Sequence, residues 1–136
     1  MASAVIKGVN HRTTPTKTAM MDHDALTEAV RSALPSQEGR AGRDLWFIGD
    51  LDGTERRAME WARALTRLHA EHDIGNAPLW IPAASFGSTG AASGAIALCM
   101  AARAFERGHA PARQCSVWMC SEAGARGAVL VRAVTN

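Results

Sequence analysis

The chain has 136 residues, of which 47% are hydrophobic and 21% charged, and its formal net charge at pH 7 is +2. This length and composition predict one folded domain over residues 1–136 and exclude a disordered or fibrous chain. The charge is too small to indicate nucleic-acid binding. Since neither a run of about 18 apolar residues nor a signal-peptide pattern occurs, we expect no membrane association and a cytoplasmic location.

Strand-like and helix-like segments alternate along the chain. The predicted elements are a strand at 4–9, a helix at 24–34, a strand at 45–48, a helix at 55–72, a strand at 79–81, a helix at 89–107 and strands at 115–120 and 127–134. The order βαβαβαββ predicts an α/β fold with a mostly parallel five-stranded sheet and helices packed on it. The last two strands are joined by only a few residues, so we expect them to be antiparallel.

The helix expected at 55–72 is amphipathic. Arginines recur on one side, and Met59, Ala62, Leu65 and Leu68 recur at helical spacing. We expect these four apolar side chains to face the core.

The most informative segment is a glycine-rich turn followed by a helix of small and apolar residues. From 91 to 102 this helix has no polar face, which predicts burial on all sides and therefore a partner surface. Small residues allow another backbone to approach closely. The predicted interface residues are Gly87, Gly90, Ala91, Gly94 and Leu98. The alternative is an internal helix of a self-sufficient domain.

Metal and cofactor signals are weak. The three cysteines at 99, 115 and 120 lack Cys-x-x-Cys spacing and are predicted to be reduced core residues. His69 and His72 are expected to favour the carboxyl end of a helix rather than to bind a metal. The glycines do not match a dinucleotide-binding loop, so we expect no cofactor. The cysteine spacing and the position of the histidines lead us to expect no metal site either.

Three stretches carry a family likeness. Asp52-Gly53-Thr54 follows a strand, Gly87-Ser88 opens the small-residue helix with Ala83 five residues before Ser88, and 121–127 is a glycine-containing turn. The chain thereby resembles the carboxyl-terminal half of β-ketoacyl synthases, which are condensing enzymes of the thiolase fold. The family has His-Gly-Thr, Gly-His and a lysine where this chain has Asp52, Ser88 and Ala83.

The resemblance implies a protein without catalysis. The half that carries the cysteine nucleophile is absent, and an ionised aspartate and a serine are poor substitutes for two histidines. It implies an inactive scaffold or adaptor that forms a homodimer, or a heterodimer with a ketosynthase-like amino-terminal half. Analogy with short relatives adds a role with type VI secretion effectors. The alternative is a subunit of a split β-ketoacyl synthase or acyltransferase.

A second motif is open to another interpretation. The string Phe-Ile-Gly-Asp-Leu-Asp-Gly-Thr at 47–54 resembles the first motif of haloacid-dehalogenase-like phosphatases, in which Asp50 would attack phosphorus and Asp52 would act as acid and base. Both lysines precede this motif, and a late acidic pair for magnesium is missing. The simpler interpretation is a polar turn in which Asp52 caps the following helix.

Overall fold

The computed structural model describes residues 2–11, 25–34, 44–71, 74, 77–86, 92–121 and 125–135. The elements are β1 (Ala2–His11), α1 (Ala25–Ala33), β2 (Leu45–Gly49), α2 (Glu55–Glu71), β3 (Leu79–Trp80), α3 (Pro82–Phe86), α4 (Ser93–Glu106), β4 (Gln114–Cys120) and β5 (Arg126–Thr135). The predicted α/β class is confirmed. One short helix, α3, was not expected, and it takes up the proline-led start of the segment predicted to be a turn.

The five strands form one sheet in the order β1-β5-β4-β2-β3. Strand β2 is parallel to both β3 and β4. Strand β5 is antiparallel to β4, as expected, and also to β1, where Ala2 lies opposite Thr135. The prediction of a mostly parallel sheet is therefore wrong, because β1 pairs at the edge with the last strand instead of joining the parallel set. The sheet is mixed.

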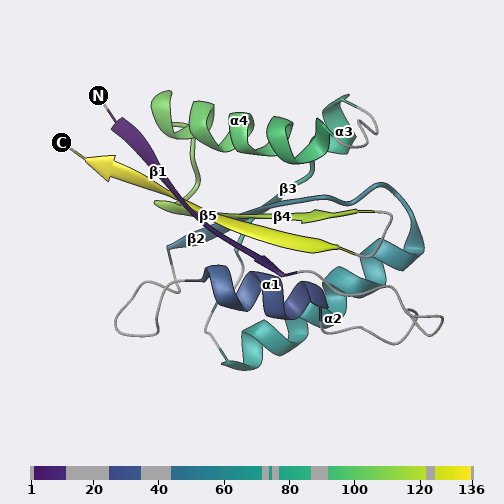
Figure 1. Ribbon diagram of the computed structural model, residues 1–136. Helices are drawn as coiled ribbons and strands as arrows, with labels where there is room; N and C mark the ends of the chain where they lie inside the picture. The colour runs from purple at the N-terminus through teal and green to yellow at the C-terminus, as the bar shows by residue number, and fades with distance from the viewer. Residues whose placement is uncertain are drawn as a thin grey trace.

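Helices cover both faces of this sheet. Helices α1 and α2 lie on one face, and α3 and α4 lie on the other (Figure 1). The two ends of the chain meet at one end of the sheet, as the pairing of β1 with β5 requires. Within the described ranges, no helix is both long enough and apolar enough to cross a membrane.

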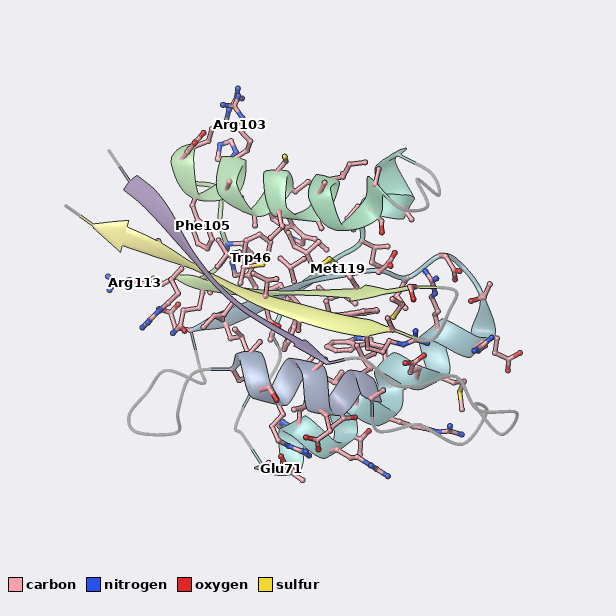
Figure 2. The ribbon with its side chains drawn as sticks, viewed as in Figure 1. Trp46, Glu71, Arg103, Phe105, Arg113 and Met119 are labelled. Carbon is pink, nitrogen blue, oxygen red and sulfur yellow. The ribbon has the colours of Figure 1, made fainter. Side chains whose placement is uncertain are left out.

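The core between the sheet and α4 is built from alternate residues of the strands. Trp46 of β2 and Phe105 of α4 meet edge to face, with ring centroids 5.9 Å apart (Figure 2). Alanines on the inner side of α4 bring the helix close to the strands, since they project little from the backbone. The buried residues of this core are Trp46, Ile48, Ala97, Ala101, Ala104, Phe105, Cys115, Val117 and Val131.

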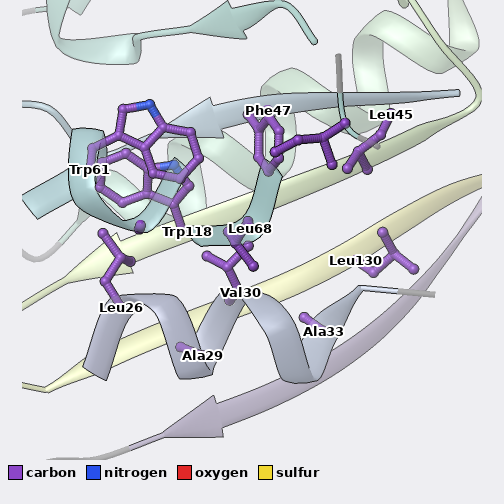
Figure 3. Packing of buried hydrophobic residues seen from close by; sticks show 13 residues of the cluster. Leu26, Ala29, Val30, Ala33, Leu45, Phe47, Trp61, Leu68, Trp118 and Leu130 are labelled. Carbon is purple, nitrogen blue, oxygen red and sulfur yellow. The ribbon is translucent and has the colours of Figure 1, made fainter. Parts of the chain in front are cut away.

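The opposite core lies between the sheet, α1 and α2. Figure 3 shows Trp61 of α2 beside Trp118 of β4, and the two rings are stacked with centroids 4.9 Å apart. Phe47 meets Trp61 edge to face at 5.1 Å. The cluster is completed by Leu26, Ala29, Val30, Ala33, Leu45, Ala64, Leu68, Ile74, Ala128 and Leu130.

The rotation of α2 differs from the prediction. Trp61 and Leu68 are buried, whereas Met59 is 48% exposed and Leu65 is 36% exposed. The large ring of Trp61 buries more apolar area than either Met59 or Leu65 could, which favours the side of the helix that turns Trp61 to the sheet. Of the four side chains expected in the core, Leu68 is confirmed, and Met59, Ala62 and Leu65 are exposed or nearly so.

Candidate functional site

The outer face of α4 is the part of the described surface that least resembles an ordinary solvent-facing helix. We use this name for five exposed residues on the side away from the sheet, namely Ala92, Ala95, Cys99, Arg103 and Glu106. Figure 2 shows Arg103 pointing away from the sheet and Phe105 pointing toward it. No charged residue occurs between Ser93 and Ala102, so the first ten residues of the helix offer water only small and apolar side chains.

The two ends of α4 differ in charge. At the amino end Ala92 makes no side-chain capping hydrogen bond, and the first turn contains no acidic residue. At the carboxyl end Arg103 and Glu106 form an exposed ion pair, with 3.3 Å between Nη1 and Oε2. Unsatisfied N–H groups make a helix amino end partly positive, so α4 has a partly positive amino end with no acidic residue in its first turn, and a carboxylate near its other end.

Two of the five interface residues expected from the sequence, Gly94 and Leu98, lie in the described part of the chain. A Cβ on Gly94 would lie 2.3 Å from Sδ of Met119, so Gly94 lies against the sheet of its own chain. Leu98 is half-buried and packs on the core that contains Trp46. Gly87, Gly90 and Ala91 lie outside the described residues. Ala95 and Cys99 are exposed, so the described part of the chain does not by itself enclose this helix on every side.

A polar cluster lies where β2 and β4 end. Asp50 accepts a hydrogen bond from the backbone N–H of Cys120 at 3.0 Å and lies 3.4 Å from Nη1 of Arg57. Arg57 also donates to the Asp50 carbonyl and approaches Asp52. Asp52 in turn accepts hydrogen bonds from the N–H and hydroxyl of Thr54, which hold the pKa of its carboxyl below the ordinary value.

The same region contains a second, more deeply buried ion pair. Arg126 donates to both carboxylate oxygens of Glu60, at 2.6 Å and 3.0 Å. It also donates to the carbonyls of Ser121 and Ala125. The bond to Glu60 raises the pKa of Arg126. These contacts fasten α2 to the connection between β4 and β5, which is a structural role.

This cluster does not support phosphatase chemistry. The interpretation of Asp50 and Asp52 as phosphatase residues is therefore wrong. A nucleophilic carboxylate has to present a free oxygen to phosphorus, but one oxygen of Asp50 is bound by Cys120 and the other faces Arg57. Among the described residues, no group of three or more His, Cys, Asp or Glu side chains is placed to hold a metal ion. Asp52 stabilises the turn by accepting hydrogen bonds from Thr54. The helix is capped by the hydroxyl of Thr54, at 3.5 Å from the backbone nitrogen of Arg57, and not by Asp52 as expected.

Two of the three positions taken from the family likeness lie within the described residues. Asp52 lies in the turn after β2, and Ala83 is half-buried in α3. Ser88 lies outside the described residues, and so does His72. His69 is exposed at the carboxyl end of α2. The described part of the chain therefore shows no catalytic constellation around these residues.

The three cysteines are free thiols in different surroundings. Cys115 is buried and Cys120 is half-buried, as core residues should be, but Cys99 is exposed on the outer face of α4. Burial raises the pKa of the Cys115 thiol and raises that of Cys120 to about 12. Cys99 is thus the accessible thiol of the chain, and its prediction as a core residue was wrong.

Comparisons with known proteins give a fold and no family. No family model matches the chain, and no curated protein matches it. A solved structure is similar over 94% of this chain, with a TM-score of 0.67 and 15% sequence identity. It is described as a type II polyketide synthase acyl-carrier protein in complex with its ketosynthase bound to the hexaketide. This chain spans 33% of the solved chain, about one third of its length.

These findings correct the assignment to a ketosynthase half. At 15% identity the similarity shows the fold alone, and the matching complex contains a carrier protein as well as a ketosynthase. Neither comparison by sequence connects the chain to condensing enzymes. The assignment therefore does not hold. Three predictions depended on this assignment and are also wrong: the inactive scaffold, the subunit of a split synthase and the role with secretion effectors.

Proposed function

We propose that this chain is a protein-binding module whose outer face of α4 is covered by another polypeptide. The observation that carries the proposal is the exposure of Ala92, Ala95 and Cys99 on a helix with no charge in its first ten residues. A helix that only shields its own sheet has polar residues on its solvent side. Helix α2 follows that rule with its arginines, and α4 does not.

The geometry of the face suits close packing. The exposed side chains from Ala92 to Cys99 are small, so a second helix can approach to about 8 Å between axes. The neighbouring Ile96 and Ala102 are half-buried and would add apolar area at the edges. Covering such a strip removes apolar surface from water, which favours association by about 25 cal/mol for each Å² buried.

The fold comparison gives independent support for a partner. The similar solved structure is a complex of two kinds of protein, and its matching chain is about three times as long as the part that matches, since 33% of it is covered.

We propose that residues 1–136 form one domain. We place its function in the cytoplasm, because its described cysteines are all free thiols, as a reducing compartment favours.

Alkylation of Cys99 tests the proposal, because the two other thiols are shielded by the fold. A membrane-permeant maleimide is added to intact cells that make the protein from its own gene, and modification of Cys99 is measured by mass spectrometry. We expect the wild type to react at least about tenfold more slowly than Ala92→Glu, which places a charge in the covered strip.

The control is Ala62→Glu on the exposed side of α2, which should leave the rate at the wild-type value. The added carboxylate of Ala92→Glu would by itself slow thiolate chemistry nearby, so faster reaction reports exposure. Equal rates in the wild type and Ala92→Glu would show that nothing covers α4 and would refute the proposed function.

A further inference from the structure

We infer that the polypeptide covering α4 is a second copy of this chain, with the two α4 helices antiparallel and Cys99 at the two-fold axis. The inference rests on the proposed function and adds the identity and the register of the partner. It follows from the order in which apolar and charged residues occur along the outer face of α4.

A two-fold axis makes each contact occur twice, so residue i facing residue j requires j to face i. With the axis at Cys99, residues at equal distances on either side face each other across the interface. Arg103 of one copy then faces Ala95 of the other, and Glu106 faces Ala92. The small apolar residues of each helix are thus covered by the longer side chains of its partner, and no two bulky residues compete for the same space.

Charge complementarity favours this register. Ala92 makes no side-chain capping hydrogen bond at the amino end of α4, and the first turn has no acidic residue. In the antiparallel pair, Glu106 of the partner reaches this end and supplies the negative charge that a helix amino end favours. The interaction occurs twice in the dimer. Arg103 stays beside Glu106 through the ion pair already present in one chain.

Other pairings of the same face lose this complementarity. Parallel helices would place Arg103 beside Arg103 and Glu106 beside Glu106, and they would bring the two partly positive amino ends together. An antiparallel pair with its axis at Arg103 would also oppose like charges. An axis at Cys99 separates the two arginines and brings unlike charges together, which selects the register that the experiment tests.

Disulfide cross-linking of the purified full-length chain tests the register. We expect mild oxidation with oxidised glutathione to give a covalent dimer through Cys99, and Cys99→Ser to abolish it. In the Cys99→Ser background, Ala92→Cys mixed with Glu106→Cys should form a mixed covalent dimer. Ala92→Cys alone should not, because its own copies lie at opposite ends of the interface.

Sedimentation equilibrium measures the strength of the pairing. Glu106→Gln is expected to raise the dimer dissociation constant about three- to thirtyfold, because two helix-end interactions are lost. The matched control Glu55→Gln, on the exposed first turn of α2, should leave the constant unchanged. Glu106 is exposed, so its substitution leaves the fold of each chain intact.

The possible results separate the two proposals. A purified chain that is monomeric at all concentrations, while Cys99 is shielded in cells, would overturn the second copy and keep the protein-binding function. A dimer that is lost in Ala92→Glu, but that forms no disulfide at Cys99 and none in the mixture of Ala92→Cys and Glu106→Cys, would overturn the antiparallel register. Equal maleimide rates in cells for the wild type and Ala92→Glu would overturn the function itself.

Discussion

Arg126 of β5 and Glu60 of α2 are 66 positions apart in the chain and form a two-point ion pair, with 2.6 Å from Nε to Oε1. Their side chains are only 9% and 12% exposed. Because Arg126 also donates to two carbonyls of the preceding connection, the buried charge is well satisfied. The pair joins α2 to the start of β5. Its two parallel hydrogen bonds fix the geometry in which the side chains meet, which an apolar contact does not do.

Breaking this pair is predicted to destabilise the fold strongly. Glu60→Gln leaves the Arg126 guanidinium buried without a counter-charge, and we expect the free energy of unfolding to fall by about 3–5 kcal/mol. Urea denaturation followed by tryptophan fluorescence measures it. Glu55→Gln, which loses only a helix-end charge, should cost less than about 1 kcal/mol. Similar losses in the two variants would contradict the structural role of the pair.

Two glycines should differ in how much stability is lost when each is replaced by alanine. A Cβ on Gly49 would lie 2.4 Å from Cζ2 of Trp118, a ring fixed by stacking on Trp61. Gly49→Ala should therefore lower the free energy of unfolding by about 1–3 kcal/mol through overpacking. Urea midpoints give the comparison with Gly94→Ala, described next.

A Cβ on Gly94 would meet Sδ of Met119, a flexible and half-buried side chain that can turn away. Alanine is also favoured over glycine inside a helix by about 1 kcal/mol. Gly94→Ala should thus change stability by less than about 1 kcal/mol in either direction. If it is as damaging as Gly49→Ala, the close approach of α4 to β4 is tighter than the flexibility of Met119 allows.

The sequence patterns predicted where elements lie better than how they pair. Period and composition placed β2, α2 and β4 within one or two residues of their observed bounds, because these signals are local. The antiparallel position of β1 beside β5 depends on contacts between the two ends of the chain, which no local pattern contains. The side of α2 that faces the sheet was missed for the same reason, since the stacking of Trp61 on Trp118 decides it.

The candidate site shows a similar division. The unusual composition of 91–102 indicates this helix as a candidate, because its lack of charge is visible in the sequence alone. Which of its sides is open is not visible, because it depends on the strands below α4. Counting from the buried Ala97, Ala101 and Ala104 would have identified Cys99 on the opposite side, had the inner face been known. The sequence pattern indicated glycines as interface residues, although Gly94 lies against Met119 of its own chain.

The turn before α2 predicts a specific dependence on pH. Hydrogen bonds from Thr54 lower the pKa of Asp52 in the folded chain, so its contribution to stability is present above the unfolded-state pKa of about 4. It is lost as the pH falls through the lower folded-state value. We expect the difference in unfolding free energy between the wild type and Asp52→Asn to be constant above pH ~5 and to shrink below pH ~4. A difference that persists at pH ~2 would show that the carboxylate charge is not responsible.

Thiol reactivity tests the two cores on either side of the sheet. Burial raises the pKa of Cys115, and that of Cys120 to about 12, so neither forms much thiolate at pH 8 in the folded state. In Cys99→Ser, a disulfide reagent at pH 8 should therefore react only as fast as the chain opens, at a rate that stops increasing with reagent concentration.

The control is Ala92→Glu, which keeps Cys99 and should show one fast-reacting thiol per chain followed by the same slow phase. Because the folded-state pKa of Cys120 is raised, its contribution to stability is complete below the unfolded-state pKa of about 8.5 and is lost as the pH rises toward 12. The slow phase should accelerate over that range. Fast labelling of Cys99→Ser at pH 8, proportional to reagent, would mean that Cys115 or Cys120 is open to solvent and that the sheet is less well covered than α1, α2 and α4 indicate.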